Sequence, residues 1–319
     1  MFMGNCRQVL PQLCALKGRG IESMAKFKYL KPSTLQEALC FLNGNESDKK
    51  VISGGTDIMV QLRNNKIDPE IIIDISEIEN LKGIHSRDGF ITIGAATTLT
   101  EIAESDIVKR YCPILAQAAA SVGATQIRNR GTIGGNVCNA SPAADTIPAL
   151  VALGAVATVV SVEQEREVLL EELFVGVGKT AINSNELLTF ISIPQPTENS
   201  AGSFFKLGKR KAQAISIVNG AVQIGVNAAE GKFTDVHVVM GSVAPTVLRI
   251  REAEESLIGR SINRQNIENA AEIVKNKISP ISDVRATADY RKDVSGNLFI
   301  EAMSDSLEQL GVDVSYPGC

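Results

Sequence analysis

The sequence predicts an α+β protein of two or three structural units, and three observations support this fold class. The chain has 319 residues, whereas a single domain usually takes roughly 150. Short β-branched runs alternate with helical segments in its first part, and its last part has strand-like segments followed by amphipathic helices. Two closely spaced prolines in "LLTFISIPQP" mark the boundary between these parts, which we place between residues 198 and 199.

The first unit is predicted to be a small α/β lobe over about residues 24–80. Ser33 and Gln36 in "KPSTLQEALCFL" form a capping-box pattern ahead of apolar residues at helical spacing, which predicts a helix. A short strand "KVISGG", a helix "TDIMVQLRNN" and a buried β-branched strand "PEIIIDI" follow. Residues 1–23 carry a broken apolar patch, so we expect a poorly ordered extension there, and neither a signal peptide nor a membrane span.

Residues 81–198 are predicted to form a second lobe. Arg87, Asp88 and Gly89 stand between two alternating segments, which indicates a hairpin. Helices are expected around residues 98–103 and 113–122. After a glycine-rich loop, "IPALVALGA" and "VATVVSV" predict a helix that begins near Asp145 and then a strand, with the proline of the helix in its first turn.

Residues 199–319 are predicted to form a mixed α+β domain. "GSFFKLGKRKAQAISIVNGAVQIGVNA" and "FTDVHVVMGSVAPTVLRI" have the composition of strands. "REAEESLIG", "NRQNIENAAEIVKNKI" and "YRKDVSGNLFIEAMSDSLEQL" have the spacing of amphipathic helices.

The composition argues against several classes of function. The chain has a formal charge of -4, 4% aromatic residues and no tryptophan, so nucleic-acid binding is not expected. No segment reaches membrane-spanning length, so no membrane association is expected either. Six scattered cysteines and two histidines offer no metal or iron–sulfur site within this chain. We interpret the cysteines as reduced thiols of a cytoplasmic protein.

A glycine-rich junction, "VISGGTD", connects a predicted strand to a predicted helix. Consecutive backbone N–H groups and the positive end of the helix dipole suit such a junction to an anion such as a phosphate. Gly54 and Gly55 allow both a sharp turn and the close approach of a ligand, although a turn without a ligand explains them too. The junction is neither GxGxxG nor GxxxxGK[ST], which disfavours a Rossmann dehydrogenase or a P-loop enzyme.

A second loop, "RGTIGGNVCNASPAAD", combines permissive glycines with hydroxyl and amide side chains. Two such loops in one domain suggest a single polyanionic ligand that spans both. Simpler readings remain for individual residues: Asp145 as a helix N-cap, Arg128 and Arg130 as solvated charges, and Cys138 as a small filler.

A basic cluster follows the proline boundary and contains Lys206, Lys209, Arg210 and Lys211. One interpretation is a basic segment that is exposed to solvent. If Lys206 points inward, it could instead provide positive charge to a bound anion or to the redox-active ring of a cofactor.

Four motifs occur in a characteristic order: "SGGTDIMVQLRN", "IRNRGTIGGNVCNASPAAD", "FFKLGKRKAQAISIV" and "GSVAPTVLRIREAEESLIG". With them the chain resembles the FAD-binding medium subunits of the molybdenum hydroxylases, the group that contains xanthine, nicotinate and aerobic carbon monoxide dehydrogenases. The resemblance covers about residues 26–310. It implies a two-lobed FAD-binding domain of the vanillyl-alcohol oxidase (PCMH) type over residues 24–198 and a CO dehydrogenase flavoprotein C-terminal-type domain over 199–319.

The resemblance also implies which residues contact FAD. The first glycine loop of the family holds the pyrophosphate, the second lies along the flavin and ribityl chain, and single contacts follow. An aromatic residue of xanthine dehydrogenase matches Val122, so any stacking there is absent. The implied FAD-binding residues are Ile52, Ser53, Gly54, Gly55, Thr56, Asp57, Ile58, Met59, Val122, Thr132, Ile133, Gly134, Gly135, Asn136, Asp145, Leu187 and Lys206. Relatives that bind flavin covalently have a histidine near the first loop; this chain has none there, so noncovalent FAD is expected.

The implied function is electron transfer within a larger enzyme, for which we expect no catalytic side chain in this chain. A large molybdopterin subunit would hydroxylate a substrate such as xanthine or nicotinate, and a small subunit with two [2Fe-2S] clusters would relay electrons to this chain. NAD+ or another acceptor would receive them, in an assembly expected to be a dimer of heterotrimers. Two alternatives remain at this stage: a self-contained FAD oxidoreductase, and a scaffold that has lost its flavin.

Overall fold

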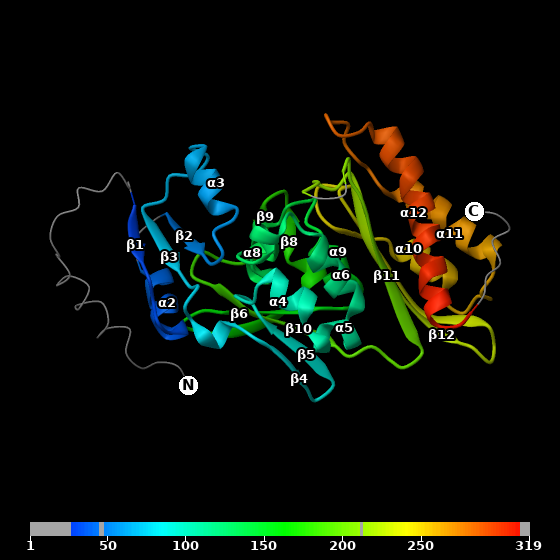
Figure 1. The fold of residues 1–319 in the computed structure, drawn as a ribbon, viewed down its shortest axis with the longest axis horizontal. Helices are drawn as coiled ribbons and strands as arrows, with labels where there is room; N and C mark the ends of the chain where they lie inside the picture. The colour runs from blue at the N-terminus through cyan, green and yellow to red at the C-terminus, as the bar shows by residue number, and fades with distance from the viewer. Residues whose placement is uncertain (1–26, 45–47, 211–212, 313–319) are drawn as a thin grey trace.

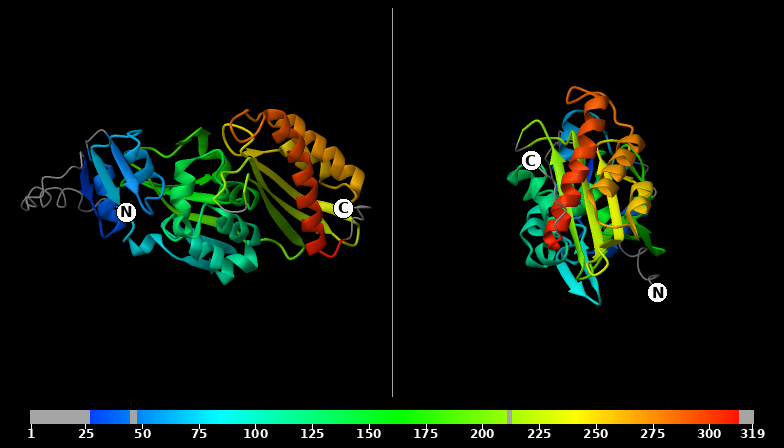
Figure 2. Two further views of the ribbon diagram at one scale, coloured as in Figure 1. Left: turned by 45° about the horizontal axis from the view of Figure 1, so that its top comes forward. Right: turned by 90° about the vertical axis from the view of Figure 1, so that its right-hand side faces the viewer.

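The computed structural model describes residues 27–44, 48–210 and 213–312. The expected extension over residues 1–23 and Lys211 of the basic cluster lie outside the described residues. Figure 1 shows three bodies in a row, and the left view of Figure 2 shows the same order. Each body is built around its own sheet, and the sheet order shows how the chain connects them.

The first body is a small α/β lobe. Its parallel sheet has the order β1-β3-β2, and the central strand is buried along its whole length because it has neighbours on both sides. The elements are β1 (Lys28–Leu30), α2 (Leu35–Leu42), β2 (Lys49–Ile52), α3 (Ile58–Arg63) and β3 (Ile71–Asp74). The predicted cap of α2 is wrong by one residue. Thr34 caps the helix by accepting from the Glu37 N–H at 3.2 Å, and the Glu37 carboxylate accepts from the Ser33 N–H at 2.8 Å.

The middle body is a five-stranded antiparallel sheet covered by helices. Asp88 and Gly89 both have positive φ, as a two-residue hairpin turn requires, so the predicted hairpin is confirmed. The sheet order is β4-β5-β10-β6-β7. The strands are β4 (Ile84–Arg87), β5 (Phe90–Gly94), β6 (Val156–Val160), β7 (Glu165–Leu169) and β10 (Leu187–Pro194), with a small β8 (Phe174–Gly176) and β9 (Lys179–Thr180) hairpin. The helices are α4 (Leu99–Glu104), α5 (Asp106–Tyr111), α6 (Pro113–Ser121), α7 (Thr125–Arg128), α8 (Ile133–Asn139) and α9 (Thr146–Ala152).

A buried ion pair connects the edge strand β7 of this sheet to the turn that leads into β10. Glu186 is 5% exposed and accepts hydrogen bonds from Arg166 Nε at 2.8 Å, Arg166 Nη2 at 2.7 Å and the Asn183 N–H at 2.8 Å. These donors, Arg166 first, lower the pKa of Glu186 to about 2. The folded state therefore favours the ionised carboxylate. Its stabilising contribution is complete above the ordinary pKa of a glutamate and is lost as the pH falls toward 2.

We expect Glu186→Gln to lower the free energy of unfolding by about 2 kcal/mol at pH 6, because the amide loses the charge that Arg166 pairs with. The difference between the two proteins should shrink as the pH falls, since the wild-type carboxylate becomes protonated and the amide does not titrate. Urea unfolding at pH 6 and pH 3 measures this. A difference that is the same at both values would contradict the assignment.

The C-terminal body is a four-stranded antiparallel sheet with three helices packed on it, which agrees with the strands and helices predicted there. Its order is β11-β12-β13-β14, and the helix-facing side forms a separate hydrophobic core. The strands are β11 (Ser200–Leu207), β12 (Val218–Asn227), β13 (Lys232–Gly241) and β14 (Leu248–Arg249). The helices are α10 (Arg251–Leu257), α11 (Arg264–Lys277) and α12 (Ala288–Gln309), of which α12 is buried against β11 and β12.

The middle and C-terminal bodies share a continuous interface. Ala221 of β12 and Val239 of β13 are fully buried in the hydrophobic core of the middle body. At the edge of this interface, Glu171 pairs with Arg251 at 2.5 Å and lies 3.8 Å from Arg249. The two bodies are therefore packed as one unit, and a groove along their junction has a defined shape.

The cysteines depart in part from the expectation of reduced thiols. Cys112 and Cys138 are free, whereas Cys40 is disulfide-bonded, so the expectation is wrong at Cys40. Among the described residues, no cluster of histidine, cysteine or carboxylate side chains has the size of a metal site. No helix in the described part of the chain is long and apolar enough to cross a bilayer.

Candidate functional site

The two glycine loops meet directly. A Cβ atom on Gly54 would lie 1.8 Å from the Arg130 carbonyl oxygen, which shows that the first loop is pressed against the backbone of the second. A Cβ on Gly131 would likewise lie 3.3 Å from Thr56 Oγ1. Both loops line one cavity of about 530 Å³, within the usual range for a small-molecule site. The prediction that one ligand spans both loops is therefore consistent with their placement.

The first loop presents unused hydrogen-bond donors to this cavity. The backbone N–H groups of residues 53–56 donate to no other described residue, and all four residues line the cavity. The Ser53 hydroxyl is buried and has no partner among the described residues. Gly55 has φ +74° at the turn, and α3 begins soon afterwards with its positive dipole end. This set of donors lacks an acceptor and suits a phosphate-like anion.

The second loop differs from its prediction, because residues that we read as loop form a helix. Thr132 caps α8 by accepting from the Gly135 N–H at 3.1 Å, and Gly134 donates to the Ala95 carbonyl at 2.9 Å. A Cβ on Gly134 would lie 2.7 Å from the Ala95 Cβ, so glycine is needed here for close packing. Since these N–H groups are used within the protein, the second loop gives the cavity its shape and contributes few free donors.

The cavity continues along the junction of the two larger bodies. Val122, Ile127, Asn136 and Asn139 line both the first cavity and a neighbouring one of about 510 Å³. Gln213 lines that second cavity and a third of about 530 Å³ beyond it. The three cavities form one groove, which we call the cofactor-sized groove. It starts at the first glycine loop and ends near Lys206.

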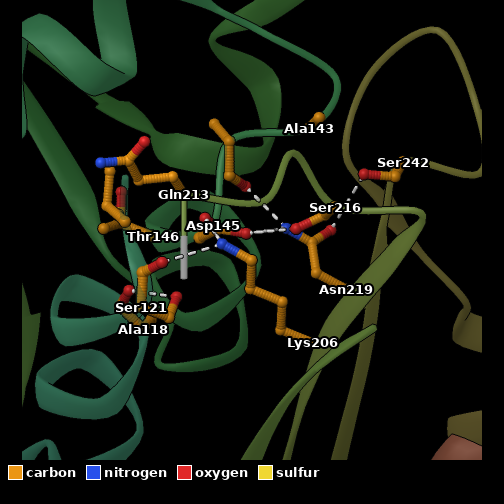
Figure 3. A network of polar contacts seen from close by, with 12 residues as sticks. Ala118, Ser121, Ala143, Asp145, Thr146, Lys206, Gln213, Ser216, Asn219 and Ser242 are labelled. Atoms are coloured by element: carbon orange, nitrogen blue, oxygen red, sulfur yellow. Dashed lines mark hydrogen bonds and ion pairs between the residues drawn. The ribbon is translucent and has the colours of Figure 1, made fainter. Parts of the chain in front are cut away.

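Asp145 anchors the far wall of this groove. Figure 3 shows its carboxylate at the centre of a buried network. Lys206 Nζ donates to Asp145 Oδ2 at 2.6 Å, and Asp145 Oδ1 accepts from Ser216 Oγ at 2.6 Å and from Asn219 Nδ2 at 2.9 Å. Asp145 occupies the N-cap position of α9, as predicted, but its side chain makes no capping hydrogen bond. The simple reading as a helix cap therefore does not account for the carboxylate.

Lys206 points inward from β11, as the sequence left open. Its ammonium also donates to the Ser121 carbonyl at 2.8 Å, and its side chain is 13% exposed. Because Asp145 neutralises it, Lys206 adds little net charge to the groove. Its neighbours in the basic cluster bond to carbonyl oxygens: Lys209 to Val284 at 2.6 Å and Arg210 to Gln213 at 2.7 Å.

Not every predicted site residue lines the groove. Ile133 and Gly134 are buried beneath it, and Leu187 is buried in the core of the first body. Met59 is exposed on α3, outside the residues that line the groove. Predicted residues that do line it are Ile52, Ser53, Gly54, Gly55, Thr56, Asp57, Ile58, Val122, Thr132, Gly135, Asn136, Asp145 and Lys206.

Several residues of the site were not predicted from the sequence. Asn139 lies one helical turn after Asn136 on α8, so helical spacing could have found it. Lys50 and Gln61 line the groove from the two sides of the first loop. Ser216 lies within the motif "FFKLGKRKAQAISIV" and Asn219 directly follows its last residue, but neither was singled out. The pairing of β11 with β12, which sets Lys206 opposite Asn219, brings them to Asp145.

Comparison with known proteins assigns a family to this arrangement. Residues 25–196 match the family described as the FAD binding domain in molybdopterin dehydrogenase. This chain belongs to that family. Residues 203–306 match the CO dehydrogenase flavoprotein C-terminal domain. The FAD-binding family thus accounts for the first two bodies and both glycine loops, and the second family accounts for the body that supplies Lys206.

Relatives of this FAD-binding family match over almost their full length. The chain is 32% identical to the nicotinate dehydrogenase FAD-subunit of Eubacterium barkeri, over 90% of this chain and 98% of that protein. It is 31% identical to the xanthine dehydrogenase FAD-binding subunit of Escherichia coli O157:H7, over 89% and 97%. A solved carbon monoxide dehydrogenase from Hydrogenophaga pseudoflava superposes with a TM-score of 0.86 at 28% identity, over 89% of this chain and 98% of the solved one. The chain is therefore an FAD-binding medium subunit of the molybdenum hydroxylase family, with the fold predicted from its motifs.

Proposed function

We propose that this chain binds FAD noncovalently along the cofactor-sized groove and acts as the electron-transfer subunit of a molybdenum-containing dehydrogenase. The observation that carries the proposal is the set of unpaired donors in the first loop. Residues 53–56 line one end of the groove, and their four backbone N–H groups and the buried Ser53 hydroxyl have no acceptor within the described protein. The pyrophosphate of FAD supplies such an acceptor.

Each part of the groove has a separate role in this proposal. The first loop binds the pyrophosphate, and the glycine contact between Gly54 and Arg130 holds the two loops at a fixed distance. Asn136 and Asn139 on α8, with Val122 opposite, line the middle of the groove. Asp145 and Lys206 close the far wall. Bound FAD supplies the redox chemistry, and these side chains bind and orient it.

The positions of the two histidines support noncovalent attachment of FAD. The chain has two histidines, His85 and His237, and neither lines the groove. His85 lies on β4, and His237 Nδ1 is 2.6 Å from the Ala152 carbonyl oxygen. The likeness of this chain, over almost its whole length, to proteins named as FAD subunits of dehydrogenases counts against the self-contained oxidoreductase.

The partners and the acceptor extend the proposal beyond this chain. A small [2Fe-2S] subunit would deliver electrons, and a large molybdopterin subunit would oxidise a substrate such as nicotinate or a purine. NAD+ is the acceptor we favour, in a dimer of heterotrimers. The names of the nicotinate and xanthine dehydrogenase relatives support the class of substrate. The free thiols of Cys112 and Cys138 support a cytoplasmic location, whereas the disulfide at Cys40 counts against it.

Purification of the complex from its native cell tests this proposal. We expect a yellow protein with two partner chains, molybdenum and iron, which reduces NAD+ when its substrate is added. Reduction of an artificial dye but not of NAD+ would overturn the choice of acceptor. A yellow and active solitary chain would support the self-contained oxidoreductase, and a colourless chain would support the scaffold.

Ser53→Ala should separate the ligand role of this hydroxyl from a structural one. The apoprotein should be at least as stable as wild type in urea, because the substitution removes a buried donor that has no partner among the described residues. FAD affinity should fall about tenfold, which is the size expected for the loss of one hydrogen bond to a charged group. Fluorescence titration with FAD measures the affinity. Unchanged affinity would show that Ser53 does not contact the ligand.

A further inference from the structure

A buried arginine of the C-terminal body binds the backbone next to the residues that hold Asp145. Arg291 on α12 is 2% exposed. Its Nη1 donates to the Ile217 carbonyl at 2.5 Å and to the Ser242 carbonyl at 3.1 Å, and its Nη2 donates to Asp283 Oδ1 at 2.9 Å. Its Nε has no partner among the described residues. Burying a charge this deeply is costly, so its position calls for an explanation beyond packing.

The first carbonyl that Arg291 binds lies in the segment that holds Asp145. Ile217 stands between Ser216 and Asn219, whose side chains both donate to Asp145 Oδ1. The Ile217 N–H donates to the Leu207 carbonyl at 2.7 Å, next to Lys206. One guanidinium bond therefore fixes the short stretch of backbone from which two of the three Asp145 donors project.

The second carbonyl belongs to Ser242, which binds the turn ahead of Asp145. The Ser242 N–H donates to the Pro142 carbonyl at 2.8 Å, in the turn that leads to Asp145. Ser242 has φ +65°, a left-handed conformation that costs a non-glycine residue energy and persists only where neighbours enforce it. Its hydroxyl also faces Asn219 Oδ1 at 3.5 Å, as Figure 3 shows. Arg291 and Pro142 thus hold Ser242 from opposite ends.

We propose that Arg291 is a positioning residue for the Asp145–Lys206 pair and, through it, for the far wall of the cofactor-sized groove. Its guanidinium binds the carbonyl groups of Ile217 and Ser242. Ile217 lies in the segment that carries Ser216 and Asn219, and Ser242 binds Pro142 in the turn ahead of Asp145. Together these contacts orient the Asp145 carboxylate. Asp283 orients the guanidinium from outside. Hydrogen bonds from the backbone of Arg285 and Ala286, together with the charges of Arg291 and Arg285, lower the pKa of Asp283 to about 2 and keep it ionised. The proposal rests on the proposed function, because bound FAD is its readout.

A double-mutant cycle on the full chain tests the proposal. Arg291→Met keeps most of the side-chain volume and removes the charge. Asp145→Asn replaces the carboxylate that Arg291 orients with an uncharged amide. We expect Arg291→Met to raise the Kd for FAD about tenfold in the wild-type background and less than about twofold in the Asp145→Asn background. Titrations are run well below each variant's unfolding temperature, so that only folded protein contributes.

Arg285→Met is the matched control. Arg285 binds the same Asp283 at 2.9 Å, but its side chain makes no hydrogen bond to Ile217 or Ser242. It should leave the Kd for FAD unchanged. Where Arg291→Met does not fold, Asp283→Asn takes its place in the cycle, because it removes the charge that orients the guanidinium.

The outcomes of this experiment are distinct. Equal effects of Arg291→Met in both backgrounds, or a lower unfolding temperature with unchanged Kd, would show a purely structural arginine and overturn the proposal. A wild-type chain that binds no FAD would instead overturn the proposed function. A larger effect for Arg285→Met than for Arg291→Met would overturn the proposal too, because the Asp283 loop would then act by another route.

Discussion

Gly54→Ala should abolish FAD binding by the full chain and lower its free energy of unfolding by more than about 3 kcal/mol. The new methyl group would lie 1.8 Å from the Arg130 carbonyl oxygen and 2.5 Å from its carbonyl carbon, and both are backbone atoms that cannot rotate away. The clash can be relieved only by separating the two loops. Because the first loop holds the free donors and the second forms the wall, separation destroys the groove. We expect the Kd for FAD to rise at least about a hundredfold.

Gly176→Ala provides the control for this substitution. Gly176 lies in β8 of the middle body, and the nearest atom to its added Cβ is the flexible Lys179 Cδ at 4.0 Å. The same chemical change there should leave the Kd for FAD unaltered and shift stability by less than about 1 kcal/mol. Urea unfolding and FAD titration of both variants make the comparison. A Gly54→Ala protein that retains wild-type affinity would show that the contact between the loops does not shape the site.

Asp145→Ala is expected to be the second severe change, at a cost of about 3 kcal/mol in the free energy of unfolding. The substitution leaves the Lys206 ammonium buried, at 13% exposure, with the Ser121 carbonyl as its remaining acceptor. It also removes the acceptor of Ser216 and one acceptor of Asn219. The far wall then loses one of the contacts between the middle and C-terminal bodies, so the affinity for FAD should fall as well.

The double variant Asp145→Ala/Lys206→Met distinguishes the cost in stability of the unpaired charge from the effect of the altered groove wall on FAD binding. Removing both charges should restore at least half of the lost stability, because no buried ammonium is left without its partner. Affinity for FAD should remain low, since the wall is still changed. If the double variant is as unstable as Asp145→Ala, the ion pair is not the source of the cost. Thermal unfolding of the four proteins in the cycle measures this.

Much of the fold follows from local patterns in the chain. The β-branched run of β3, the positive-φ turn at Asp88 and Gly89 and the long helix α12 are each determined by short-range signals, and the structure contains all three. The strand β1 and the hairpin of β8 and β9 were not predicted. Each of these strands is three residues long or shorter and depends on pairing partners that no local pattern reveals.

The site was predictable in part, for a physical reason. The first loop could be predicted because its tight turn and its accessible backbone N–H groups both require glycine, and glycine is visible in the sequence. The second loop shows the limit of that reasoning. Its glycines serve helix packing against Ala95, and their N–H groups are used. The partners of Asp145 come from β11, from β12 and from the segment between these strands, and strand register brings them together, which a single sequence does not specify.

Acid precipitation of the chain purified from its native cell, followed by analysis of the released flavin, tests directly whether the chain holds FAD without a covalent bond. We expect one FAD per chain in the supernatant, with flavin absorption bands before precipitation and a colourless pellet afterwards. We also expect the stripped chain to recover these bands when FAD is added. A chain that is colourless and takes up no FAD, or a flavin that stays with the pellet, would contradict noncovalent FAD in this groove.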